Sequence, residues 1–112
     1  MKYIVLATVG LIGLSGCVEP PKSPMEAAAR KAAAAELTAK QCAGYAGGYE
    51  SVRKLREDAN KNVTIARKLG ATDAVLQKAR TDVQTAFNTQ VAFTTQQEAC
   101  NAMVGELAWS TS

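Results

Sequence analysis

Residues 69–73, Leu-Gly-Ala-Thr-Asp, decide the fold, because they end one helical segment and begin the next. Two cations precede the stretch, where positive charge favours the C-terminal end of a helix dipole. Gly70 suits the left-handed residue that commonly follows a helix. Thr72 or Asp73 can then cap the helix that begins there. A connection this short predicts that the two helical segments are antiparallel neighbours.

The composition on either side of this turn favours an all-α fold. Hydrophobic residues make up 47% of the 112 residues but aromatic residues only 5%, so much of the apolar content is alanine. Alanine is the strongest helix former and leaves little bulk for a thick core. Apolar and polar residues do not alternate convincingly, as strands would require. We therefore expect a helical domain over residues 25–112, with helices near 25–42, 50–69 and 73–109.

The segment from Gly44 to Gly48 leaves two architectures open. It contains three glycines, each of which costs roughly 1 kcal/mol relative to alanine inside a helix. If the helix continues through them with a kink, the chain is a long antiparallel hairpin centred on the turn at 69–73. If the helix breaks there, the chain is a three-helix bundle. We favour the kinked hairpin, in which residues 25–69 form a helix roughly 68 Å long.

The two cysteines downstream of residue 17 are expected to form one disulfide. Cys42 lies as far before Ala71 as Cys100 lies after it, and residues equidistant from the turn of a hairpin sit level. Both also follow the three-four spacing of the apolar positions. A bridge between Cys42 and Cys100 would contribute roughly 4 kcal/mol through chain entropy.

The last helical segment carries an apolar stripe and a polar, uncharged outer face. The apolar positions keep the three-four spacing typical of a helix that packs along one side. They are Leu76, Ala79, Val83, Ala86, Phe93, Cys100, Val104 and Leu107.

The start of the chain carries an export signal. Met1-Lys2 is followed by an apolar run from Tyr3 to Leu14, too short to span a bilayer, and then by Ser15-Gly16-Cys17. Residues 14–17 resemble the lipobox of bacterial lipoproteins. The resemblance implies cleavage of residues 1–16 and attachment of diacylglycerol and an acyl chain to Cys17. It also implies that residues 17–24, which hold three prolines, tether the lipid to the domain.

The same resemblance predicts the location of the protein. Bacterial lipoproteins whose second mature residue is not aspartate are usually passed to the outer membrane, and that residue here is Val18. We therefore expect a lipid anchor in the outer membrane with the domain in the periplasm. An oxidising compartment also suits a disulfide.

The middle of the chain is basic. Residues 53–80 hold eight cations against three acids, and residues 81–112 hold no cation. In a hairpin the turn at Gly70 would lie at the opposite end from Cys17, so the basic region would stand away from the membrane. We expect it to contact an anionic partner, either a cell-wall polymer or an acidic protein patch; the equal alternative is that the charge only keeps a narrow domain soluble. The candidate contact residues are Lys61, Arg67, Lys68, Lys78 and Arg80.

The residues that would carry catalysis are sparse. The sequence has no histidine, and its glycines do not follow a strand as a phosphate-binding loop requires. The basic region lacks interleaved aromatic residues, which argues against nucleic-acid binding. We therefore expect no enzyme, no cofactor and no metal site.

The remaining expectation is a membrane-anchored accessory module that binds another component of the cell envelope. Small helical lipoproteins of this build resemble accessory proteins of secretion or conjugation systems. The alternatives are a plasmid- or phage-type exclusion lipoprotein and a structural spacer between the outer membrane and the cell wall. The sequence leaves the oligomeric state open.

Overall fold

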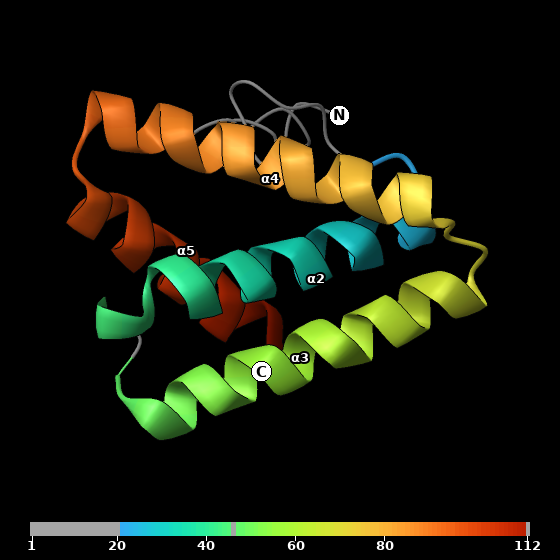
Figure 1. Ribbon diagram of the computed structural model, residues 1–112, viewed down its shortest axis with the longest axis horizontal. Helices are drawn as coiled ribbons and strands as arrows, with labels where there is room; N and C mark the ends of the chain where they lie inside the picture. Colours follow the sequence, from blue (N-terminus) through green and yellow to red (C-terminus); the bar gives the residue numbers. More distant parts are fainter. Residues whose placement is uncertain (1–20, 46, 112) are drawn as a thin grey trace, which may run out of the picture.

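A computed structural model describes residues 21–45 and 47–111, with side chains as far as residue 107. Four α-helices and one short 3-10 turn account for most of this part, and no strand occurs in it (Figure 1). The elements are α2 (Pro24–Gln41), η1 (Ala43–Tyr45), α3 (Tyr49–Lys68), α4 (Asp73–Phe93) and α5 (Gln96–Thr111). The expected all-α fold is confirmed.

Helix α2 is the centre of the molecule. It packs against α3, α4 and α5. Figure 1 shows α2 between α4 and α3, with α5 passing behind α2. Most of the buried residues of α2 are alanines, and their small side chains let neighbouring helices approach on several sides. The alanine-rich segment is therefore the part of the chain around which the other helices pack.

The chain reverses direction at every connection. Helix α3 runs antiparallel to α2, since Ala28 clusters with Ala66 at one end while Ala35 clusters with Ala59 further along. Helix α4 returns parallel to α2, and α5 then runs antiparallel to it, with Leu107 in the same cluster as Ala35. The result is an up-down-up-down arrangement.

The long kinked helix is not present, because α2 ends at Gln41 and α3 begins at Tyr49. The three-helix bundle left as the alternative is not present either, since the described residues form four α-helices. After α2 has ended, Gly47 and Gly48 adopt positive φ angles of 100° and 111° directly before the start of α3. Helix α3 therefore folds back along α2. This places α3 and α4 on opposite sides of α2 (Figure 1), so the expectation that they pack as direct neighbours across the turn at Gly70 is wrong.

The expected continuous helix over 73–109 is also broken, at Thr94. The Thr94 hydroxyl donates to the carbonyl of Gln90 at 2.6 Å. The Thr95 hydroxyl accepts from the amide of Glu98 at 3.1 Å and caps α5. A threonine followed three residues later by glutamate is the spacing of a capping box, which is the signal that the periodicity argument overlooked.

This second break changes which aromatic residue lies in the core. Phe93, expected on the apolar stripe, is the last residue of α4 and is 83% exposed. Phe87 is instead only 4% exposed and packs with Leu37 and the two cysteines. The predicted apolar stripe is therefore wrong at Phe93, which lies in solvent and not in the core.

The helix-ending signals around Gly70 are confirmed. Gly70 has φ 105°. Its amide donates to the carbonyl of Arg67 at 3.0 Å, and the amide of Ala71 donates to the carbonyl of Ala66 at 2.9 Å. These two bonds form a Schellman motif. The Thr72 hydroxyl accepts from the amide of Val75 at 3.3 Å and caps α4.

The disulfide between Cys42 and Cys100 is present. The two Cα atoms lie 5.4 Å apart, and both residues are fully buried. The equidistance argument gave the right pair although the long hairpin does not exist. Helices α3 and α4 have 20 and 21 residues, so the chain leaves along α3 and returns along α4 to nearly the level from which it started.

The additional chain reversals make the described part of the molecule short. They also place the start of α2 at another end of the domain than we expected. The Cα extents are 43 × 35 × 25 Å, well below the length of the helix first expected. Met25, in the first turn of α2, packs on the cluster that contains Ala71 and Leu76. The start of α2 and the turn at residues 69–72 therefore lie together, at what we call the Gly70 end. The expectation that the tether enters opposite Gly70 is wrong for the residues that the structure describes.

Candidate functional site

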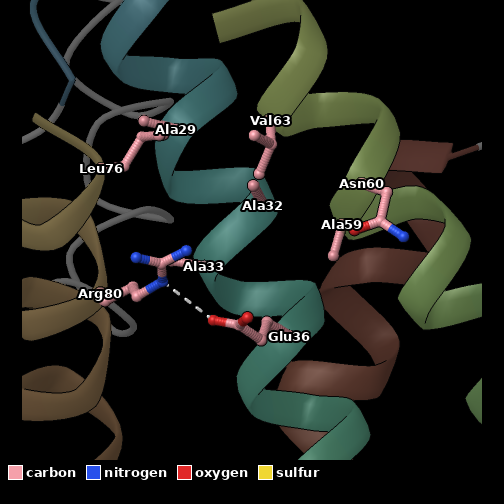
Figure 2. A pocket seen from close by; sticks show the side chains of 9 residues that line it. All are labelled: Ala29, Ala32, Ala33, Glu36, Ala59, Asn60, Val63, Leu76 and Arg80. Carbon is pink, nitrogen blue, oxygen red and sulfur yellow. Dashed lines mark hydrogen bonds and ion pairs between the residues drawn. The ribbon is translucent and has the colours of Figure 1, made fainter. Parts of the chain in front are cut away.

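A groove runs along α2, on the side between α3 and α4 (Figure 2). Its volume is about 170 Å³. We call it the α2 groove; its lining residues are Ala29, Ala32, Ala33, Glu36, Ala59, Asn60, Val63, Leu76 and Arg80.

The floor of the α2 groove exists because α2 presents only methyl groups there. Ala29, Ala32 and Ala33 lie at one-helical-turn spacing and are between 2% and 5% exposed. Leu76 from α4 forms one wall, and Val63 from α3 forms part of the other (Figure 2). Larger residues on α2 would fill this space with their own side chains.

One end and one edge of the groove are polar. Arg80 Nε donates to Glu36 Oε1 at 3.1 Å, which links α4 to α2 across the groove. The two side chains remain 44% and 36% exposed, so the ion pair is reachable from solvent. Asn60 lies on the α3 edge and is exposed (Figure 2). The α2 groove therefore combines an apolar floor with polar groups at its margin, as ligand and partner sites commonly do.

The size of the groove limits what it can hold. An apolar cavity of about 150 Å³ accepts one benzene molecule. The α2 groove is of that size but open to solvent, so it suits a single apolar side chain of a partner. It is too small for a whole helix, whose diameter with side chains is about 10 Å.

Two further hollows lie elsewhere around α2. The larger, of about 240 Å³, is bounded by Lys31, Asp58 and Lys61 and reaches Leu107 of α5. The smaller, of about 60 Å³, lies between α2 and α4 beside Arg30 and Lys78. The first adjoins the part of α5 whose side chains lie outside the described region.

The five cations expected to form one contact surface are spread over the molecule. Arg80 lines the α2 groove, Lys61 lines the hollow beside α5, and Lys78 lines the hollow between α2 and α4. Arg67 and Lys68 lie at the Gly70 end, in the last turn of α3. Arg67 and Lys68 are neighbours in the chain, and none of the three hollows described above is lined by more than one of the five cations.

Three of the five cations have acidic partners within the molecule. Besides the Arg80–Glu36 pair, Lys78 Nζ lies 2.8 Å from Asp82 Oδ2, and Arg67 Nη2 lies 2.7 Å from Asp73 Oδ1. The hydrogen bond from Arg67, together with its positive charge, lowers the pKa of Asp73 below its ordinary value. Lys61 and Lys68 form no ion pair with any residue that the structure describes.

Of the other predicted positions, Cys42 and Cys100 meet, whereas Cys17 and the cleavage site at residues 14–17 lie outside the described residues. Over residues 21–45 and 47–111, no group of three or more potential metal ligands gathers. No helix in the same part of the chain is long and apolar enough to cross a membrane.

Sequence reasoning missed the α2 groove. Its signal was visible as the run of alanines at residues 27–29 and 32–35, which leaves α2 without bulky residues on several sides. What the sequence could not supply was the placement of Val63 and Leu76 on either side of that run. That placement depends on two chain reversals, one between α2 and α3 and one between α3 and α4.

No family model, no curated protein and no solved structure matches this chain.

Proposed function

We propose that the protein is an outer-membrane lipoprotein whose periplasmic helical domain binds another protein of the cell envelope without catalysing a reaction. The observation that carries the anchor is Cys17 at the end of a short apolar run, seven residues before α2 begins at Pro24. The buried Cys42–Cys100 disulfide supports export, since such bonds persist in oxidising compartments.

The α2 groove supports the binding role. Its apolar floor and its polar margin fit a partner segment that inserts one leucine or aromatic side chain beside Leu76 and Val63. A polar or charged group next to that side chain would meet Arg80, Glu36 or Asn60 at the margin. The partner in this proposal is therefore a protein surface with one protruding apolar residue among polar neighbours.

Position-specific photocrosslinking in living cells tests this role. A photoreactive amino acid replaces Asn60, at the edge of the α2 groove, and Asn88 is replaced in a matched control, since it is an exposed asparagine on α4 outside the groove. The proposal predicts one discrete adduct from position 60 and none from position 88.

A second variant separates true occupation of the groove from chance proximity. Val63→Lys places a charge on the groove wall and should abolish the adduct from position 60. Helical circular dichroism and an intact disulfide, seen by mass without reductant, show that the variant is folded. An adduct that survives Val63→Lys, or equal adducts from positions 60 and 88, would contradict the assignment of the groove.

A further inference from the structure

The Gly70 end carries an exposed apolar residue beside cations. Leu69 directly follows α3 as its C-cap residue and is 51% exposed. Lys68 precedes it and makes no ion pair within the described residues, and Arg67 lies one residue further back. Apolar burial at the acyl boundary and attraction of each lysine or arginine to anionic headgroups both favour a surface of this kind against anionic lipid.

The start of α2 fixes where this end lies relative to the tether. A Cβ atom placed on Gly70 would lie 4.0 Å from the sulfur of Met25. The amide of Lys22 donates to Glu26 Oε1 at 3.1 Å, which holds the chain before α2 against the first turn of the helix. The tether therefore enters the domain at the same end that displays Leu69.

The length of the tether then limits how far this end can stand from the lipid. Four residues lie between Cys17 and Lys22, and the five residue steps that join them cover at most about 18 Å when fully extended. The opposite end of the domain, with Phe93, is further away by the length of α2, about 27 Å for its 18 residues. The Gly70 end is thus the part of the domain nearest to a membrane that holds Cys17.

We propose that the turn at residues 67–70 lies on the anionic headgroups of the membrane that anchors Cys17, with Leu69 at the acyl boundary and Lys68 beside lipid phosphates. This inference rests on the lipid anchor of the proposed function. It reverses the orientation expected for a hairpin, and it leaves the α2 groove on the flank of the domain, accessible to a protein partner. Arg67 Nη2 lies 2.7 Å from Asp73 Oδ1, so this cation is paired across the turn, whereas Lys68 is not paired within the described residues.

Depth-dependent fluorescence quenching tests the orientation on the lipidated full-length protein. Trp109 is the only tryptophan, so the unmodified protein supplies the background signal. Leu69→Trp and Phe93→Trp add one reporter at each end of the domain, both at exposed positions. Each protein is reconstituted into phosphatidylglycerol vesicles with and without brominated acyl chains, which quench tryptophans that reach the acyl boundary.

The proposal predicts a loss of emission for Leu69→Trp beyond the background, and no added loss for Phe93→Trp. The loss should shrink when Lys68→Glu is combined with Leu69→Trp, and in phosphatidylcholine vesicles. Equal quenching in phosphatidylcholine would overturn the role of anionic headgroups. Quenching of Phe93→Trp instead of Leu69→Trp would overturn the orientation.

The same samples also test the lipid anchor, through flotation of the protein with the vesicles and through the presence of its acyl chains. If the protein floats with the vesicles and carries its acyl chains but Leu69→Trp is unquenched, the orientation is wrong and the lipoprotein proposal stands. If the protein neither floats nor carries acyl chains, both proposals fall together.

Discussion

The connection between α3 and α4 depends on the left-handed backbone conformation of Gly70. Its φ of 105° lies in the left-handed region, where residues with a Cβ atom are strained. The Schellman hydrogen bonds at its amide and at that of Ala71 depend on this conformation. Ala71 and Ala66, which the motif brings together, are both buried in the same cluster. The direction in which the chain enters α4 is thus set at one residue.

Gly70→Ala should lower the free energy of unfolding by about 1 kcal/mol, because alanine must adopt the strained left-handed conformation. Gly105→Ala is the matched control, since Gly105 lies inside α5 without a positive φ and with open space at its Cβ position. That change should raise the free energy of unfolding, by up to about 1 kcal/mol. Urea denaturation measures both, and a Gly70→Ala variant as stable as Gly105→Ala would contradict the assigned turn.

Helices α4 and α5 are separate elements, although their apolar residues follow one continuous period in the sequence. The break at Thr94 turns the chain so that Cys100 meets Cys42, and it leaves Phe93 in solvent while Phe87 enters the core. Periodicity alone could not locate this break, because threonine is tolerated within a helix. The signal for the break in the sequence was the spacing of Thr95 and Glu98, which form the capping hydrogen bond in the structure.

Two phenylalanines on the same helix distinguish the broken helix from a continuous one. Phe87→Ala should lower the free energy of unfolding by about 3–5 kcal/mol, because it leaves a cavity beside Leu37 and the disulfide. Phe93→Ala should change it by less than about 0.5 kcal/mol, because the side chain is exposed. Chemical denaturation of both variants checks this, and a reversed order of effects would support the continuous helix.

The disulfide joins the end of α2 to the first turns of α5. Cys42→Ser and Cys100→Ser should each lower the free energy of unfolding by about 4 kcal/mol, since each removes the same crosslink between residues 58 apart in sequence. Thermal unfolding with and without reductant provides the measurement. The mass of the unreduced wild-type monomer should be two protons below that of the reduced form. Markedly unequal effects of the two substitutions would mean that the cysteines act independently.

At the scale of the whole molecule, the sequence predicted local features correctly but did not predict how the helices pack against one another. The all-α class, the cap at Thr72 and the left-handed Gly70 follow from neighbouring residues, and all are present. The packing of α3 and α4 on opposite sides of α2 does not follow from local signals. It depends on which of the alanine-rich surfaces of α2 each of the other helices covers.

The cysteine pair could be predicted from the sequence, whereas the α2 groove could not. The pairing of Cys42 with Cys100 was predictable because α3 and α4, with 20 and 21 residues, carry the chain away from Cys42 and back to nearly the same level. The groove was not, because Val63 and Leu76 face it only after the glycine break and the turn at Gly70 have placed their helices. The distribution of the five cations over separate surfaces has the same origin.

The central claim is that Cys17 anchors this four-helix domain to a membrane. Labelling cells with palmitate, followed by fractionation and intact mass of the wild-type protein and Cys17→Ala, tests it most directly. The wild-type protein should incorporate the label, fractionate with the outer membrane and begin at Cys17 with the added mass of its acyl chains. Cys17→Ala should lose the label and the membrane association while it keeps the Cys42–Cys100 disulfide. A Cys17→Ala protein that still carries palmitate, or a wild-type protein without it, would contradict the claim.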